Sequence, residues 1–189
     1  MNRWNLWTDT LWLDFGNVTL SNINREPKNL PKNWAVVNQD FKFATDSWVY
    51  LLVSSHGMPI NHRAFPAVAH PIHLHGHDFA ILQQSSTQYK VGGLNLKLDN
   101  PPRRDVALLP KDGFLVIAFK ADNPGSWLMH CHIVWHAAGG LALQILENRS
   151  KIKLSPEDSS ELQRICDSWN EWNTLPDGTK RVLQDDSGI

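Results

Sequence analysis

The stretch "WLMHCHIVWHAAGGL", residues 127–141, holds three histidines and one of the two cysteines of the chain within seven residues. Successive side chains of an extended segment point to opposite faces, so His130 and His132 are predicted to share one face and Cys131 to occupy the other. His136 can return to the cysteine side through a turn, which the following "AAGG" suits. The stretch therefore predicts two sets of metal ligands on one strand.

A second histidine cluster, "HPIHLHGH", covers residues 70–77. His73 and His75 are two residues apart, so an extended segment points both to the same side. His70 lies beyond a proline and can face elsewhere. This cluster also predicts one pair of imidazoles and one separate imidazole.

Together the two clusters supply two donor sets. One is a two-histidine, one-cysteine set of the type 1 blue-copper kind, and the other is a group of four imidazoles that suits copper, zinc or iron. The predicted sets are His70, Cys131 and His136 on one side, and His73, His75, His130 and His132 on the other.

A zinc hydrolase is the main rival interpretation, because H-x-H spacing also serves zinc. It does not account for Cys131, which stands between two imidazoles with a third beyond it. Seven of the nine histidines lie in the two clusters. The isolated His56 and His62 are interpreted as structural or solvated residues.

The composition limits the remaining possibilities. The 189 residues carry a net charge of −1, enough chain for one domain with a core and no charge excess for nucleic-acid or membrane binding. No apolar run reaches the roughly 20 residues that a membrane span needs. The first residues, "MNRWNLWTDTLWLDF", do not read as a signal peptide. Sequons at Asn17 and Asn148 are by themselves weak indications of secretion.

Short apolar or alternating segments separated by turn signals predict an all-β antiparallel sandwich or barrel. The expected strands lie within 48–55, 72–84, 105–110, 113–121 and 140–147. The period then changes: Ser155 as N-cap, Pro156 behind it and apolar residues at helical spacing predict one amphipathic C-terminal helix.

The motifs H-P-x-H-x-H-G-H and H-C-H-x-x-x-H-x-x-x-G, both intact here, resemble the C-terminal copper signatures of the multicopper oxidases. "PPRRDVALLP" and "FKADNPGSWLMHCHI" also look like the third domain of that family, and the tail "DDSGI" resembles ascomycete-type fungal laccases. The resemblance implies a cupredoxin-like Greek-key β-barrel or sandwich at residues 1–150, followed by a C-terminal helix and tail at 151–189.

The resemblance also implies roles for individual residues. His70, Cys131 and His136 correspond to type 1 copper ligands, His73 to a type 2 ligand, and His75, His130 and His132 to type 3 ligands. Leu141 falls at the axial position, where it cannot coordinate, and Trp135 with residues 66–69 would shape a substrate pocket. Asp186 would assist proton delivery, and the carboxylate of Ile189 would lie in the channel to the cluster.

The implied function is that of a laccase. Single electrons from phenolic substrates enter at the type 1 copper and pass through Cys131 to His130 and His132. A trinuclear copper cluster there reduces O2 to water. By the same resemblance the protein is extracellular, with lignin-derived phenols as one substrate class.

The chain departs from the family in one respect. It lacks the H-W-H and H-x-H pairs of the first domain, so it supplies only four of the eight trinuclear ligands, and Cys166 lacks the first-domain cysteine that the family pairs with it. We therefore expect an N-terminally truncated laccase, inactive alone, whose partners are the missing first and second domains. The alternatives are a stand-alone type 1 copper electron-transfer protein and a non-catalytic fragment.

Overall fold

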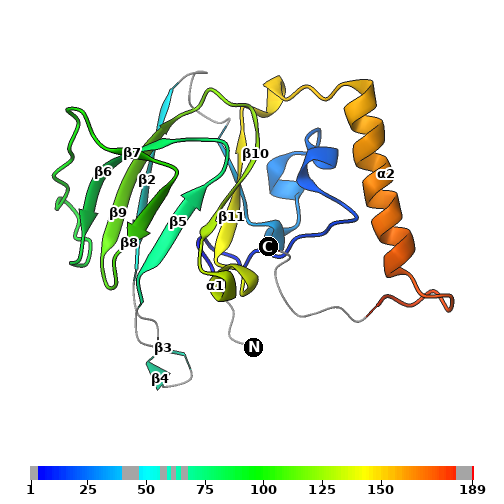
Figure 1. Cartoon of the computed structure of the whole chain (residues 1–189), viewed down its shortest axis with the longest axis horizontal. Coiled ribbons are helices and arrows are strands. Elements are labelled where there is room, and N and C mark those ends of the chain that lie inside the picture. The colour runs from blue at the N-terminus through cyan, green and yellow to red at the C-terminus, as the bar shows by residue number, and fades with distance from the viewer. Residues whose placement is uncertain (1–3, 40–46, 56–58, 61–62, 65–67, 182–188) are drawn as a thin grey trace. The chain divides into compact units, whose positions relative to one another are not determined.

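The computed structural model describes residues 4–39, 47–55, 59–60, 63–64, 68–181 and 189 (Figure 1). The chain forms two compact units. The first comprises residues 1–42, 124–128 and 134–189, and the second comprises 43–123 and 129–133. His56, His62, Pro66 and Asp186 lie outside the described residues. Among the described helices, none combines the length and the apolar character that crossing a membrane requires.

The second unit is built from antiparallel strands. One sheet has the order β2-β9-β6-β7, with β2 at Trp48–Ser54, β9 at Phe114–Lys120, β6 at Phe79–Ser85 and β7 at Arg103–Arg104. A second layer contains β5 (His70–Leu74) and β8 (Val106–Leu109), and β5 also pairs with the end of β10 (Gly125–Cys131). Strand β3 (Pro59–Ile60) pairs in antiparallel with β4 (Arg63–Ala64).

Strand β9 is the centre of this unit. Its sequence "FLVIAFK" is apolar almost throughout, and every residue but the last is buried, as expected of a strand covered on both faces. On one side the buried side chains of β9 pack with those of β6, and Tyr89 and Leu96 cover them. This apolar run fixes the position of the neighbouring strands.

The strands predicted within 48–55, 105–110, 113–121 and 140–147 are confirmed. The segment 72–84 was predicted as one strand, but a turn at residues 75–76 divides it into β5 and β6, which lie in different sheets. Of the two predicted architectures, barrel and sandwich, the structure is a sandwich. The strand order is not sequential, as in a Greek key, and the sheet of β9 ends at β2 and β7 without closing. Strand β7 has only two residues, after which the chain passes through Asp105 into β8 of the other layer. The chain therefore changes sheets here and does not extend the first sheet into a closed barrel.

The first unit combines short helical turns with a parallel strand pair. Its 3₁₀ turns are η1 (Thr19–Asn22), η2 (Pro27–Asn29), η3 (Lys32–Trp34) and η4 (Arg149–Lys151). Strand β1 (Val36–Asn38) pairs in parallel with β11 (Ala142–Glu147), and α1 spans Val134–Ala138. The buried Gln144 amide ties these parts together, since its oxygen accepts from Thr19 at 2.8 Å and its nitrogen donates to the Trp34 carbonyl at 2.9 Å.

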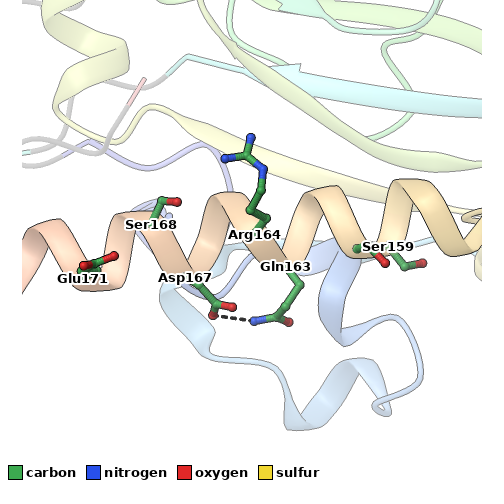
Figure 2. Close-up of a pocket in the computed structure, with 7 residues that line it drawn as sticks. Ser159, Gln163, Arg164, Asp167, Ser168 and Glu171 are labelled. Atoms are coloured by element: carbon green, nitrogen blue, oxygen red, sulfur yellow. Dashed lines mark hydrogen bonds between the residues drawn. The ribbon is translucent and has the colours of Figure 1, made fainter.

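The predicted C-terminal helix is α2, Pro156–Asn173. The Ser155 hydroxyl accepts from the backbone N–H of Asp158 at 3.0 Å, and the Asp158 carboxylate accepts from the Ser155 N–H at 3.2 Å, which is a capping box. Figure 2 shows the polar side of this helix, where Gln163 donates to Asp167 at 2.7 Å. The shallow hollow there is lined only by polar side chains of α2, so we interpret it as the solvated face of the helix.

Candidate metal centre

The register between β5 and β10 decides how the two histidine clusters meet. Cys131 lies opposite Ile72, and His130 lies opposite His73. Residues directly opposite one another in an antiparallel pair project to the same face. His70, two residues from Ile72, therefore shares the face of Cys131, while His73 shares the face of His130.

The cysteine face is buried. Cys131 is fully buried and His70 is 6 % exposed, and the Cys131 Sγ lies 3.6 Å from the Nδ1 of His70. Ile72 and Leu74, both fully buried, continue this face along β5. Burial raises the pKa of the Cys131 thiol, and the hydrogen bond from the Ile133 backbone opposes that shift in pKa. A buried thiol of this kind is held as a neutral group until a metal ion replaces its proton.

The opposite face carries the predicted group of four imidazoles, all in the second unit. The ring centroid of His73 lies 4.7 Å from that of His75 and 5.5 Å from those of His130 and His132. His130 and His132 stack with centroids 5.6 Å apart. Single ligand atoms of His73, His75 and His130 all lie within 4.8 Å of one another. Three imidazoles thus converge closely enough to bind one ion, and His132 adjoins them.

Backbone carbonyls fix which nitrogen these rings present. The Nδ1 of His73 donates to the Asp105 carbonyl at 2.8 Å, and the Nδ1 of His130 donates to the Cys131 carbonyl at 2.9 Å. A neutral imidazole with its proton on Nδ1 offers Nε2 as the ligand atom. The Nε2 atoms of His75 and His130 already lie 3.2 Å apart. The carbonyl contacts therefore leave Nε2 as the ligand atom of His73 and His130, and the Nε2 of His130 faces that of His75.

The surroundings of two of these imidazoles, His75 and His130, favour the neutral form. Burial lowers the pKa of His130, against the hydrogen bond to the Cys131 carbonyl, and neighbouring His75 lowers it further. Burial is also the main cause of the lowered pKa of His75, followed by the charges of His73 and His132. Only a neutral imidazole binds a metal ion, so both shifts in pKa favour ligation near neutral pH.

The chain leaves the extended conformation earlier than the sequence predicts. Pairing ends at Cys131, residues 132–133 form a bend, and the predicted turn that carries His136 is the short helix α1. The helix ends at Ala138 and a turn at Gly139 and Gly140 follows, where Gly140 has a φ of 92°, a left-handed conformation that glycine adopts without strain.

The environment of His136 within the first unit holds one residue that the sequence did not single out. The ring of Trp4 lies against the His136 ring with centroids 4.6 Å apart, and the Trp4 N–H donates to the Gly139 carbonyl at 2.8 Å. Burial lowers the pKa of His136. Trp135, by contrast, is 80 % exposed and does not pack in the core, and Leu141 is buried.

His77, the last histidine of the second cluster, lies outside both donor sets. Its ring packs against Phe119 with centroids 4.8 Å apart. Its Nδ1 donates to the His75 carbonyl at 3.1 Å. These contacts suit a residue that shapes the turn after His75.

Known proteins resemble this chain in sequence and in fold. The multicopper oxidase family profile matches residues 9–151. A laccase of Arthroderma benhamiae is 43 % identical over 199 aligned residues, covering all of this chain and 30 % of that protein. Laccase-2 of Botryotinia fuckeliana is 39 % identical, covering 98 % of this chain and 30 % of that protein. The crystal structure of the laccase from Botrytis aclada superimposes with a TM-score of 0.78 at 38 % identity, covering 96 % of this chain and 31 % of that chain.

The chain therefore belongs to the multicopper oxidase family. It spans about 30 % of the length of the curated laccases it matches, in agreement with a laccase C-terminal domain. The family implies copper, and the donor sets fit it, because a thiolate with imidazole suits a blue-copper ion and clustered imidazoles suit further copper ions.

Proposed function

We propose that this chain is the third, electron-accepting domain of a laccase-type oxidoreductase that oxidises phenolic substrates and reduces O2 to water. The observation that carries the proposal is the register of β5 and β10. It sets Cys131 beside His70 on one face of the strand pair and His130 beside His73 on the other. One strand thereby serves two donor sets.

Each donor set would hold its own copper. We assign His70, Cys131 and His136 to the type 1 ion, with Leu141 at the non-ligating axial position. His73 is assigned to the type 2 ion, and His75, His130 and His132 to the type 3 ions. The buried thiol and the carbonyl-oriented imidazoles support this division.

Bound copper supplies reversible one-electron chemistry at both sets. The chain itself positions the two donor sets and connects them. Cys131 is bonded through the backbone to His130 and His132, so a continuous covalent path links the buried thiol to the imidazole face. The bend after Cys131 ends the strand before α1, and α1 presents Trp135 to solvent, where the side chain can form one wall of a phenol-binding surface.

The imidazole group needs further ligands. Four histidines are half of the eight that the family's trinuclear cluster uses, and His75 remains exposed. We propose that the first and second laccase domains complete the cluster, so that the isolated chain does not reduce O2. The division into residues 1–150 and a tail at 151–189 stays a prediction.

Copper titration of the isolated chain tests this proposal. About one tightly held equivalent with an intense blue band, and no O2 consumption, is the expected result. If the blue chain also takes electrons from a reduced donor protein and passes them on, the result would favour a stand-alone electron-transfer protein. Absence of the blue band would leave a non-catalytic fragment and contradict the proposal.

We further propose that the protein is a secreted glycoprotein that acts on phenols, including those of lignin. The two sequons differ sharply in accessibility. Asn17 is exposed, and Asn22 donates to its side-chain oxygen at 2.7 Å, which turns the Asn17 amide nitrogen away from that contact. Asn148 is 8 % exposed and has a left-handed φ of 44°. A glycan therefore fits Asn17 and not Asn148.

Expression through a eukaryotic secretory pathway checks this assignment by mass spectrometry. Asn17→Gln is expected to remove the glycan mass, and Asn148→Gln is the matched control that keeps it. A glycan found on Asn148, or on neither site, would discard the assignment.

The tail completes the proposal. We infer that Asp186 assists proton delivery and that the Ile189 carboxylate lies in the channel to the cluster, as the resemblance implies. Removal of residues 187–189 from an otherwise complete enzyme is expected to change the rate of O2 reduction. Unchanged kinetics would remove the tail from the mechanism.

A further inference from the structure

We propose that the ion pair between Asp78 and Arg103 is a positioning device: it holds the Asp105 carbonyl against His73 and so sets the direction of that ligand. The inference deepens the proposed function, because it concerns one of the histidines assigned to copper. Asp78 and Arg103 touch none of the reacting groups and act only through the backbone.

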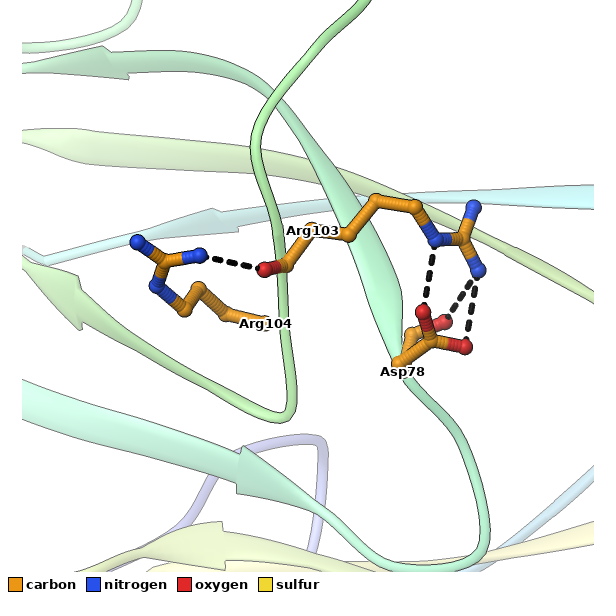
Figure 3. Close-up of polar contacts among 3 residues, drawn as sticks. All are labelled: Asp78, Arg103 and Arg104. Atoms are coloured by element: carbon orange, nitrogen blue, oxygen red, sulfur yellow. Dashed lines mark hydrogen bonds and ion pairs between the residues drawn. The ribbon is translucent and has the colours of Figure 1, made fainter.

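The contact itself is a two-pronged one (Figure 3). The Arg103 Nε donates to one carboxylate oxygen of Asp78 at 2.6 Å, and a terminal nitrogen donates to the other at 2.8 Å. The same terminal nitrogen donates to the Asp78 backbone carbonyl at 3.0 Å. Planar guanidinium and carboxylate groups match in this geometry, so the pair specifies direction as well as distance.

The pair joins two segments that both adjoin the imidazole group. Asp78 ends the turn that follows His75, at the entry to β6. Arg103 forms β7 with Arg104, and it lies two residues before Asp105, where the chain crosses into β8. Only two planar peptide units separate Arg103 from Asp105, so a displacement of Arg103 acts on Asp105 over a short stretch of backbone.

The Asp105 carbonyl is the acceptor that orients His73. It accepts from the His73 Nδ1 at 2.8 Å and also from the Leu74 backbone N–H at 3.1 Å. One backbone oxygen thus fixes both the end of β5 and the ring of the ligand. If the crossing shifts, the ring loses the partner that holds its proton on Nδ1 and its Nε2 toward the other imidazoles.

Backbone pairing holds this crossing on both sides. Strand β7 has two residues, which pair with Phe79 and Ala80 of β6, and β8 pairs with β5 from Val106, opposite His73. Pro101 and Pro102 before β7 have no N–H to donate, and the Ile81 N–H donates to the Pro102 carbonyl at 2.8 Å. The three bonds from the Arg103 side chain add to this pairing at the short β7 end of the crossing. The guanidinium also lies over the Trp48 ring, 5.7 Å from its centroid, which limits its swing.

An ordinary surface ion pair would have different consequences. Arg103 and Asp78 are partly exposed, at 44 % and 64 %, and exposed pairs contribute little to the free energy of unfolding. If the pair positions His73, its loss should change the hydrogen bond and orientation of the His73 ring without a matching change in the free energy of unfolding. The pair Glu161–Arg164 on α2 has the same two-pronged geometry, at 2.7 and 2.6 Å, far along the chain from any ligand, and is the matched control.

The first test needs no metal. In the full chain, NMR of the imidazole nitrogens reports the His73 Nδ1–H and its exchange with solvent. Arg103→Lys, which keeps the charge but not the fork, and Asp78→Asn, which keeps the size but not the charge, are each expected to speed that exchange severalfold. Arg164→Lys is expected to leave it unchanged. If Asp78→Asn does not fold, Arg103→Lys decides.

The second test is Zn²⁺ titration in a Cys131→Ser background, where the imidazole group is the set that remains. Loss of a direct partner of a ligand costs about 10- to 100-fold in affinity, so we expect about 3- to 10-fold for this indirect one. Unchanged Nδ1–H exchange and Zn²⁺ affinity in folded Arg103→Lys would overturn the inference. A chain that shows the Nδ1–H effect but forms no blue copper would refute the proposed function and keep the positioning role.

Discussion

The two faces of the β5–β10 strand pair differ in what surrounds them. On one face, Cys131 and His70 are buried together with Ile72 and Leu74 of the core. On the other face, His73 and His130 are only partly buried and His75 is exposed. The same pair of strands thus presents a dry thiol site on one side and an open imidazole site on the other.

The two faces also differ in what fixes their geometry. The buried face is fixed by apolar contacts, so its geometry persists without metal. The open face is fixed by single hydrogen bonds to backbone carbonyls, those of Asp105 and Cys131. Substitutions on the two faces should therefore fail in different ways.

The largest effect is expected for Cys131→Ser. A serine hydroxyl does not replace a thiolate as a soft copper ligand, so the blue absorption band should disappear entirely. The absorption spectrum after copper addition measures this directly. Persistence of the band would show that the type 1 assignment is wrong.

The next effect is expected for His130→Ala on the opposite face. Removing one of three converging imidazoles should weaken Zn²⁺ or Cu²⁺ binding at that face by at least about tenfold, because each ligand bond contributes to a chelate. The blue band should remain, since Cys131 is retained. If the blue band is lost together with metal binding at the imidazole face, the two faces do not act as separate sites.

Stability provides a third comparison between the faces. Leu74→Ala, which opens a cavity at a fully buried position, should lower the free energy of unfolding by about 2–5 kcal/mol. His75→Ala, the adjacent residue on the exposed side, should change the free energy of unfolding by about 0.5 kcal/mol or less. Urea denaturation of the metal-free chain measures both, and equal effects would contradict the contrast in burial.

The last prediction concerns a position away from both faces. Ser155→Ala removes the capping box of α2 and should cost about 1 kcal/mol of unfolding free energy. Copper binding and the blue band should not change. The hydrogen bonds from Ser155 lower the pKa of Asp158. The stabilising contribution of the Asp158 carboxylate to folding is therefore present above its unfolded-state pKa, and it is lost as the pH falls through the lower folded-state pKa.

Much of the fold follows from the sequence alone. Apolar alternation and turn residues placed the strands, and Ser155, Pro156 and Asp158 placed the start of α2. The two-residue spacing of His73 and His75 correctly put both imidazoles on one face. These features depend on local periodicity and on side-chain chemistry, which the sequence states directly.

Other features did not follow from the sequence. The extended segment was expected to continue through His132, but pairing ends at Cys131 and a short helix replaces the expected turn. Local spacing allows either conformation at this point. The contact of Trp4 with His136 joins residues more than 130 positions apart, and no local pattern marks it.

The sequence by itself determined which atoms can bind metal: two histidine clusters, one cysteine between imidazoles, and the alternation that separates them into sets. The tertiary structure decided which members meet and how they are held. Strand register set Cys131 beside His70 and His130 beside His73, and a sheet crossing supplied the Asp105 carbonyl. The reason is physical: every residue carries a backbone carbonyl, so only the register of distant strands decides which one a ligand reaches.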